Sequence, residues 1–283
     1  MCAPIAWADG FTWDSGYLGD KPDAEDINVN TGNLSPKLPE NILEKVAPTK
    51  VDKEEPISIS PPLKGEGWLA IAVDEYWYHR TTVMPINGKW FAPERWAVDY
   101  VQLTPNNLFA NDDSTVNENY PQYGQEIIAV KDGYIISTKD ELPDNIPPTL
   151  PDDMTLEKAG GNHVFQDIGQ GYSAFYAHMI PGSVKVKEGD YVTKGQVLGL
   201  LGNSGNTDAP HLHFHIIEGT NPLGADGVPY VIDSFTITDM VESEDNLDAE
   251  FESPTTPLTV VSQDPKNYTN VMPENLSIVT FAE

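Results

Sequence analysis

Apolar residues along this chain occur in short runs separated by glycine, proline and other turn-forming residues. The runs at residues 68–73, 95–101 and 126–130 have the length of a β-strand and are short for a stable helix. Similar runs follow at residues 163–168, 173–178, 196–201 and 211–217. Short strands with glycine turns about every eight to twelve residues predict an all-β sandwich or barrel.

The segment from residue 126 to residue 136 carries the clearest turn signal. Residues 126–130 and 134–136 are both β-prone, and Asp132-Gly133 lies between them. Glycine supplies the positive φ that a tight two-residue turn requires. We therefore expect the two segments to pair as a β-hairpin.

Changes in composition divide the chain into three parts. Residues 1–60 are rich in Pro, Asp, Glu and Asn and show no lasting periodicity, which predicts a tail or linker. Residues 61–235 hold the strand-like runs and form the expected main domain, and residues 236–283 are expected to be a small acidic β extension. Within the main domain, residues 102–123 and 137–160 are irregular and are expected to be long surface loops.

Charge and cysteine content limit the classes of function and partner that the chain can have. The 283 residues include 44 acidic and 16 basic ones, for a formal net charge of −28. Nucleic acid is not expected as a partner, because binding phosphate requires clustered Lys and Arg. No apolar run approaches about 18 residues, so no transmembrane segment is expected. The single cysteine, Cys2, cannot form an internal disulfide. It is either the lipid-bearing residue of a lipoprotein or incidental.

Three of the six histidines fall within Pro210-His211-Leu212-His213-Phe214-His215. Because alternate residues of a strand point to the same face, His211, His213 and His215 share one face and the apolar residues between them share the other. One buried histidine is usually a satisfied core group, whereas three in alternation more often line a metal or proton-transfer site. We interpret this segment as one wall of such a site.

Two further residues are candidates for the same site. Asp99 lies inside an apolar strand, between Val98 and Tyr100, and a buried carboxylate needs a partner. Zinc accepts carboxylate oxygen and histidine nitrogen, commonly from three protein residues with water in a fourth position. His178 ends the run at residues 173–178, where it either joins this site or is an exposed histidine at a strand end.

Several motifs surround these residues. They are Tyr123-Gly124, Ile128-Ala129-Val130-Lys131-Asp132-Gly133, Gly161-Asn162-His163-Val164, Tyr176-Ala177-His178, the stretch 186–199, Gly202-Asn203-Ser204-Gly205-Asn206 and Pro210-His211-Leu212-His213-Phe214. Together they cover about residues 66–235, and in this order the chain resembles the lysostaphin-type (LytM-like) zinc metalloendopeptidases. A His-x-His after a Gly-Asn loop, with an upstream Asp and a Tyr-Ala-His, is a specific combination.

The resemblance implies an antiparallel β groove with one zinc ion per chain at its floor. It implies that Asp99 and His213 are zinc ligands, and that His178 and His211 polarise the attacking water and steady the tetrahedral intermediate. The implied substrate is the peptide part of bacterial peptidoglycan. The implied location is secreted, periplasmic or associated with the cell envelope.

The sequence departs from the family pattern at the first zinc ligand. The family has a histidine four residues before the aspartate, and this chain has Arg95 there, whose guanidinium has no lone pair to give. His79 could reach the metal instead, His215 could stand in, or the site holds no metal. We favour His79, because Tyr78-His79-Arg80 followed by Arg95 resembles a variant of the family with an upstream His-Arg pair.

Two functions therefore compete. The first is a zinc peptidase. The second is a catalytically inactive LytM-like module that regulates other wall hydrolases, as degenerate relatives of the family do. Arg95 favours the inactive module, whereas His178, His211 and His213 favour the enzyme, because a regulator has no need of histidines with proton-transfer roles.

Overall fold

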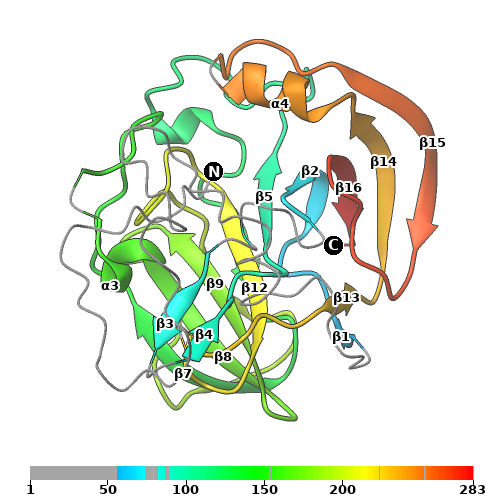
Figure 1. The fold of residues 1–283 in the computed structure, drawn as a ribbon. Helices are drawn as coiled ribbons and strands as arrows, with labels where there is room; N and C mark the ends of the chain where they lie inside the picture. The colour runs from blue at the N-terminus through cyan, green and yellow to red at the C-terminus, as the bar shows by residue number, and fades with distance from the viewer. Residues whose placement is uncertain are drawn as a thin grey trace, which may run out of the picture.

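The computed structural model describes residues 56–73, 79, 82–86, 89–152, 154–222, 224–251 and 253–282. The expected tail therefore lies outside the described residues up to position 55, and so does Cys2. Strands dominate the described part (Figure 1), and the all-β prediction is confirmed. None of the helices described is long and apolar enough to cross a lipid bilayer.

The central element is a ten-stranded sheet in which every neighbouring pair is antiparallel. Its strands, in spatial order, are β10 (Tyr191–Val192), β7 (Gly133–Lys139), β8 (Asn162–Gly169), β9 (Tyr172–Met179), β12 (Leu212–Glu218), β5 (Val98–Gln102), β2 (Gly65–Ile71), β16 (Ser277–Phe281), β14 (Phe235–Val241) and β15 (Val260–Tyr268). Figure 1 shows β12 and β5 side by side near the middle of this sheet.

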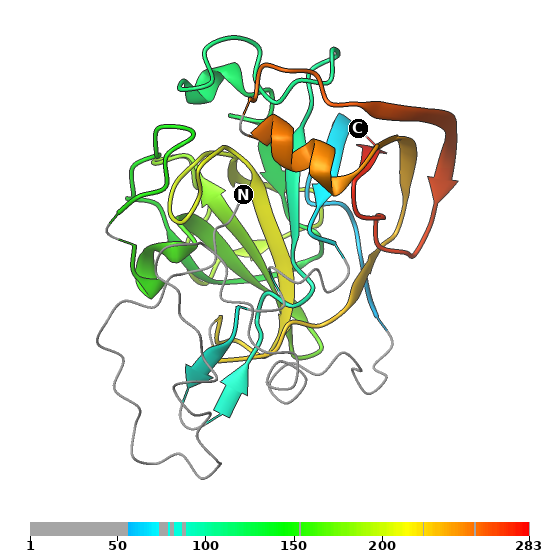
Figure 2. The same cartoon turned by 45° about the horizontal axis from the view of Figure 1, so that its top comes forward.

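Three two-stranded sheets and three short helices complete the described fold. The strand pairs are β1 (Ile57–Ile59) with β13 (Tyr230–Ile232), β6 (Glu126–Ile128) with β11 (Val197–Leu200), and β3 (Met84–Ile86) with β4 (Lys89–Phe91). The helices are the 3₁₀ turn η1 (Asn117–Asn119), α3 (Leu156–Ala159) and α4 (Glu244–Phe251). In Figure 2, α4 lies across the end of the sheet near β14.

The two faces of the large sheet bury different residues, as strand alternation requires. On β12, Leu212, Phe214 and Ile216 point into the larger hydrophobic cluster, together with Trp68 and Tyr100. The opposite face presents Asp99 and the histidines between these apolar residues. On this second face a smaller cluster covers the part of the sheet beside the histidines; it includes Leu69, Ile71, Val101, Phe109, Tyr120 and Leu258.

The prediction of a hairpin at residues 126–136 is wrong, although both segments form strands. β6 pairs with β11, and β7 pairs with β8 and β10, so the two segments do not pair with each other. Gly133 is not among the residues with positive φ. Its missing side chain instead makes room for β8, because a Cβ at this position would overlap the carbonyl oxygen of Asp167.

The C-terminal strands continue the main sheet. β16 lies between β2 and β14, with Ile278 opposite Leu69. β14 and β15 extend the sheet to its outer edge, at the right of Figure 1. In the described residues the acidic extension expected from position 236 is therefore hydrogen-bonded to the strands of the expected main domain.

Candidate metal centre and catalytic site

The site is built on one cross-strand pair. His213 of β12 lies directly opposite Asp99 of β5 in the antiparallel ladder. The His213 Nδ1 atom is 2.9 Å from Asp99 Oδ1. Both side chains are buried, with 2% of the surface of each residue exposed. The pairing register thus fixes a carboxylate against an imidazole in the interior of the fold.

His79 approaches the same carboxylate from outside the large sheet. Its Nε2 atom lies 3.3 Å from Asp99 Oδ2, and the residue is fully buried. Its Nδ1 atom lies 3.2 Å from the carbonyl oxygen of Ala97. Because a carbonyl only accepts, Nδ1 carries the donated proton, and in the neutral ring Nε2 directs a lone pair towards Asp99.

These three residues fit a zinc ion by the chemistry of their donor atoms. Potential ligand atoms of His79, Asp99 and His213 all lie within 4.8 Å of one another. Zinc bonds to histidine nitrogen and carboxylate oxygen at about 2.0–2.2 Å, so two ligands of a tetrahedral ion lie roughly 3.3 Å apart. The observed separations are 2.9 Å from His213 Nδ1 to Asp99 Oδ1 and 3.3 Å from His79 Nε2 to Asp99 Oδ2, so each nitrogen lies near a different oxygen of the carboxylate. Two nitrogens and one oxygen would leave a fourth position open, as in catalytic zinc sites.

His178 and His211 lie beside this group, with ring centroids 4.7 Å apart. The Nδ1–H of His178 donates to the carbonyl oxygen of Ser204 at 2.7 Å, and the Nδ1 of His211 lies 2.9 Å from the carbonyl oxygen of Ala209. His211 Nε2 is 3.8 Å from Asp99 Oδ1 and has no hydrogen-bond partner among the described residues. In their neutral forms both rings therefore carry the lone pair on Nε2.

Burial and neighbouring charges shift the pKa values of these groups in different directions. Burial lowers the pKa of His178 well below its usual range and lowers the pKa of His211 to about 4. For Asp99, burial alone would raise the pKa, but the neighbouring His79 and His211 bring it well below its ordinary value. For His79, burial opposes the charged form, yet the Asp99 carboxylate raises the pKa above its ordinary value. At neutral pH the site thus combines a carboxylate with neutral His178 and His211 rings.

The backbone around His178 is held by close packing. His178 has a φ of 63°, a left-handed conformation that is uncommon for a residue with a side chain. Its N–H donates to Gly160 O at 3.1 Å, and its carbonyl accepts from Gly202 N–H at 2.9 Å. Gly161, with a φ of +59°, packs so closely that a Cβ there would overlap the carbonyl of Ser204. The same Ser204 carbonyl holds the His178 ring, so this packing fixes the ring in place.

The loop that contains Ser204 is anchored by polar side chains of the long irregular stretches. Asn203 N–H donates to Asp144 Oδ1 at 2.8 Å. The amide of Asn145 donates to the carbonyls of Gly205 and Thr207 at 2.7 and 2.8 Å. Sequence reasoning did not assign a role to Ser204 or to Asn145. The turn-rich composition of residues 202–206 was the only signal available.

His215 and Arg95 lie outside the three-residue group of His79, Asp99 and His213. His215 lies behind His213, with its Nδ1 atom 2.9 Å from His213 Nε2, on the side away from Asp99. Arg95 is buried, with 6% of its surface exposed, in the turn before β5. The structure therefore places His79, and not His215, in the group that contains Asp99 and His213.

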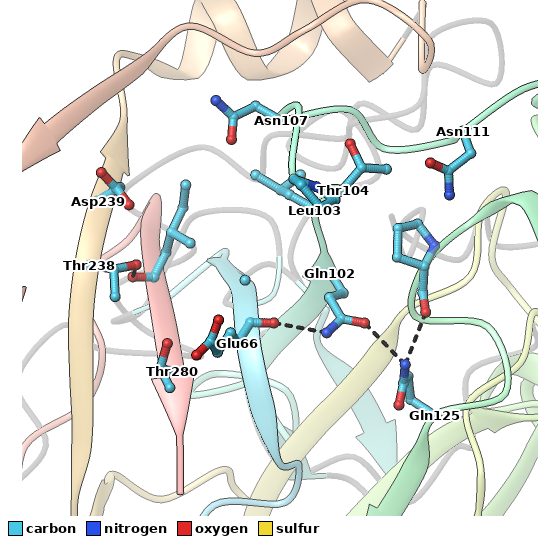
Figure 3. A pocket seen from close by; sticks show the side chains of 14 residues that line it. Glu66, Gln102, Leu103, Thr104, Asn107, Asn111, Gln125, Thr238, Asp239 and Thr280 are labelled. Carbon is cyan, nitrogen blue, oxygen red and sulfur yellow. Dashed lines mark hydrogen bonds between the residues drawn. The ribbon is translucent and has the colours of Figure 1, made fainter.

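A separate cavity of about 600 Å³ lies over strands β5, β2, β16 and β14 (Figure 3). Amide and hydroxyl side chains dominate its lining, and Glu66 and Asp239 add carboxylates. Gln102, at the end of β5, donates to Glu66 O at 2.8 Å, and Gln125 donates to Gln102 Oε1 at 3.3 Å. Part of the lining comes from the irregular residues 102–123.

Comparison with known proteins identifies the central part of the chain. The model of "Peptidase family M23" matches residues 118–225. His178, His211 and His213 lie inside the matched stretch, and His79 and Asp99 precede it. The departure from the family pattern at Arg95 falls in the part that is not matched.

Two curated relatives match part of the chain. The peptidoglycan DD-endopeptidase ShyA of Vibrio cholerae is 38% identical over 65 residues, which are 23% of this chain and 15% of that protein. Lysostaphin of Staphylococcus simulans is 36% identical over 75 residues, 25% of this chain and 15% of that protein. This chain thus spans about 15% of the length of these relatives.

Among solved structures, the catalytic domain of lysostaphin from Staphylococcus simulans aligns with a TM-score of 0.30 and 24% identity, covering 50% of this chain and 78% of that one. The sequence matches carry the assignment: residues 118–225 match peptidase family M23, in line with the lysostaphin-type motifs that the chain resembles.

Proposed function

We propose that this chain is a zinc metalloendopeptidase that hydrolyses peptide bonds of bacterial peptidoglycan, with one zinc ion per chain. The observation that carries the proposal is the convergence of His79, Asp99 and His213, whose ligand atoms lie within 4.8 Å of one another. His178 and His211 lie next to this group without belonging to it. A metal-binding group with two adjacent neutral histidines supports metal-assisted hydrolysis, because the metal can activate water and a neutral imidazole can accept its proton.

His79, Asp99 and His213 would hold the metal. Zinc, when bound, supplies Lewis-acid chemistry that polarises a carbonyl oxygen and makes water more acidic. His211 and His178 each present a neutral Nε2 towards the site, because their Nδ1 atoms face backbone carbonyls. A neutral imidazole can accept a proton from water and return it to the leaving amine, and its protonated form can donate to an oxygen that gains negative charge. The backbone contacts of both rings keep these nitrogens oriented.

The substrate class and the location follow from the family. The relatives include a peptidoglycan DD-endopeptidase and lysostaphin. We therefore assign the peptide part of peptidoglycan as substrate, and a secreted, periplasmic or cell-envelope location. Lipidation of Cys2 would tether the protein in the envelope. The irregular residues 102–123 and 137–160 border the site. Gln122 donates to Pro210 O at 2.6 Å, next to His211, and Asn145 donates to the carbonyl of Gly205. We expect these two stretches to determine which bond is cut.

The direct test is mass spectrometry of purified muropeptides before and after incubation with the zinc-loaded chain. We expect new products whose masses differ from the substrate by hydrolysis of one peptide bond. Chelation of the metal and the His211→Ala variant should each abolish them. A zinc-loaded, folded protein that releases no product from any muropeptide would overturn the assignment.

A catalytically inactive module is the second candidate, and one observation favours it. Arg95 occupies the position of the family's first ligand and is buried there. Such a module would bind peptidoglycan or a wall hydrolase without cutting. The muropeptide experiment separates the two, because the inactive module yields a bound complex and no new masses.

A further inference from the structure

The two ring nitrogens of His213 have different partners. Nδ1 lies 2.9 Å from Asp99 Oδ1, and Nε2 lies 2.9 Å from His215 Nδ1. His215 is buried, with 3% of its surface exposed, and its ring stacks on Phe175 with centroids 5.2 Å apart and an interplanar angle of 30°. The imidazole of His215 is thus fixed by packing at the back of the His213 ring.

This contact determines which nitrogen of His213 can bind a metal. A neutral imidazole has one lone pair and one N–H, and only the nitrogen with the lone pair can be a ligand. If Nδ1 of His213 is the ligand, its Nε2 carries the proton and needs an acceptor. His215 Nδ1 is the acceptor that the structure provides at hydrogen-bond distance.

The opposite arrangement is suited to the protein without metal. There His213 Nδ1–H donates to the Asp99 carboxylate, a charge-assisted hydrogen bond. His213 Nε2 then accepts from His215 Nδ1–H, and His215 Nε2 is left with its lone pair. That nitrogen is buried and has no hydrogen-bond partner in the described part of the chain. A lone pair there avoids leaving a buried N–H without an acceptor.

We propose that His215 is a positioning residue: it holds the His213 ring so that Nδ1 faces Asp99, and its Nδ1 accepts a hydrogen bond from the His213 Nε2–H when a metal binds. The proposal rests on the metal centre of the proposed function. Metal binding at His213 Nδ1 would place the His213 proton on Nε2, where it donates to His215 Nδ1. The His215 proton would then lie on its buried Nε2, and metal binding has to offset the cost of that N–H without an acceptor. Outer partners of this kind orient metal-binding histidines and increase their basicity.

The test compares zinc affinities measured by competition with a chromophoric chelator. His215→Leu removes the acceptor and should weaken zinc binding by about 10–100-fold. His215→Gln restores an acceptor through its amide oxygen and should recover most of the affinity. His163→Leu is the matched control, because His163 packs on the same Phe175 ring at 4.9 Å without contacting His213. Equal affinity of wild type, His215→Leu and His163→Leu would overturn the proposal.

Nitrogen NMR of the histidine rings in the wild-type protein gives a second measurement that does not depend on a variant folding. Without metal, the proton of His213 should be on Nδ1, and with one equivalent of zinc it should be on Nε2, with the same change on His215. An unchanged His215 ring on zinc loading would contradict the proposal. If the wild type itself binds no zinc, the proposed function fails, and this outcome is distinct from tight binding without a role for His215.

Discussion

Asp99 Oδ1 and His213 Nδ1 face each other at 2.9 Å across one directly opposed residue pair of β5 and β12. Both residues belong to central strands, so the pair is held by the hydrogen bonds of the sheet on either side. His79 joins them from a segment outside the large sheet, through a contact of 3.3 Å to the other carboxylate oxygen. Two of the three residues proposed as ligands are therefore fixed by strand register, and the position of the third depends on how one connecting segment packs.

His79→Ala should lose zinc under dialysis against a chelator that leaves the wild type loaded. The substitution removes one of three donor groups and leaves the buried Asp99 without its 3.3 Å partner. Metal content per folded chain is the measurement, with circular dichroism to confirm folding. His163→Ala is the control and should keep its zinc. Retention of a full equivalent by His79→Ala would show that His79 is not a ligand.

His178→Ala and His211→Ala should each bind zinc and lose hydrolysis. Neither residue belongs to the three-residue group, but their rings lie 4.7 Å apart beside it. Removal of a general acid or base lowers the rate by about 10²–10⁴-fold. The measurement is kcat on a muropeptide, together with metal content. Variants with full activity would remove these residues from the mechanism, and variants without zinc would place them in the metal-binding group.

Gly161→Ala should destabilise the protein far more than Gly169→Ala. Both glycines have positive φ, so both substitutions carry backbone strain of about 1 kcal/mol. Only at Gly161 would the new Cβ overlap the Ser204 carbonyl, which holds the His178 ring, whereas nothing lies within 4 Å at Gly169. Urea unfolding of the two variants measures the difference. A similar loss of unfolding free energy in both variants would show that the backbone near Ser204 moves to make room for the new Cβ.

The metal-free protein should lose stability as the pH falls from about 6.5 towards 4. Burial lowers the pKa of His211 to about 4 and lowers the pKa of His178 and His215 well below their usual range. In the unfolded chain these rings take up protons near pH 6.5, whereas in the folded protein they resist. Protonation therefore favours unfolding in this window, and full stability is present above it. His211 alone contributes on the order of 3 kcal/mol.

Two other site residues do not change this direction. Asp99 has a depressed pKa in the folded protein, so its contribution is lost only at pH values below this window. His79 has a raised pKa, so its contribution is complete below pH 6.5 and is lost as the pH rises through that raised value. Urea unfolding in the presence of a chelator at several pH values measures how the free energy of unfolding changes with pH. His211→Gln should reduce this pH dependence, and an equal pH dependence in the variant would contradict the assignment of the effect to His211.

The alternation of residues along β12 predicted one side of the site. Leu212 and Phe214 enter the core, and His213 points to the opposite face towards Asp99. This inference needed only the strand period, which is a local property of the sequence. The location of His79 is not local, because its contact with Asp99 depends on the path of the intervening chain. Only the resemblance to a family variant indicated it.

The hairpin error has the same physical origin. The β-prone composition of residues 126–136 was sufficient to predict two strands, and Asp132-Gly133 suggested that they pair. β6 instead pairs with β11, about 70 residues further along the chain, and the turn glycine serves a close approach to Asp167. The choice of strand partner is decided by packing of the whole sheet. The same limit applies to β16, whose position beside β2 has no signal in either segment alone.

The placement of β16 between β2 and β14 bears on how the molecule folds. Leu69 pairs with Ile278, so residues from opposite ends of the described chain must meet before the edge of β2 is covered. Pairing over such a separation is slow, because the loop-closure entropy is lost before the contacts form. β5, which carries Asp99, is the other neighbour of β2. Until the last strand docks, a partly folded chain would expose the edge of β2 to other chains, and such edges promote aggregation.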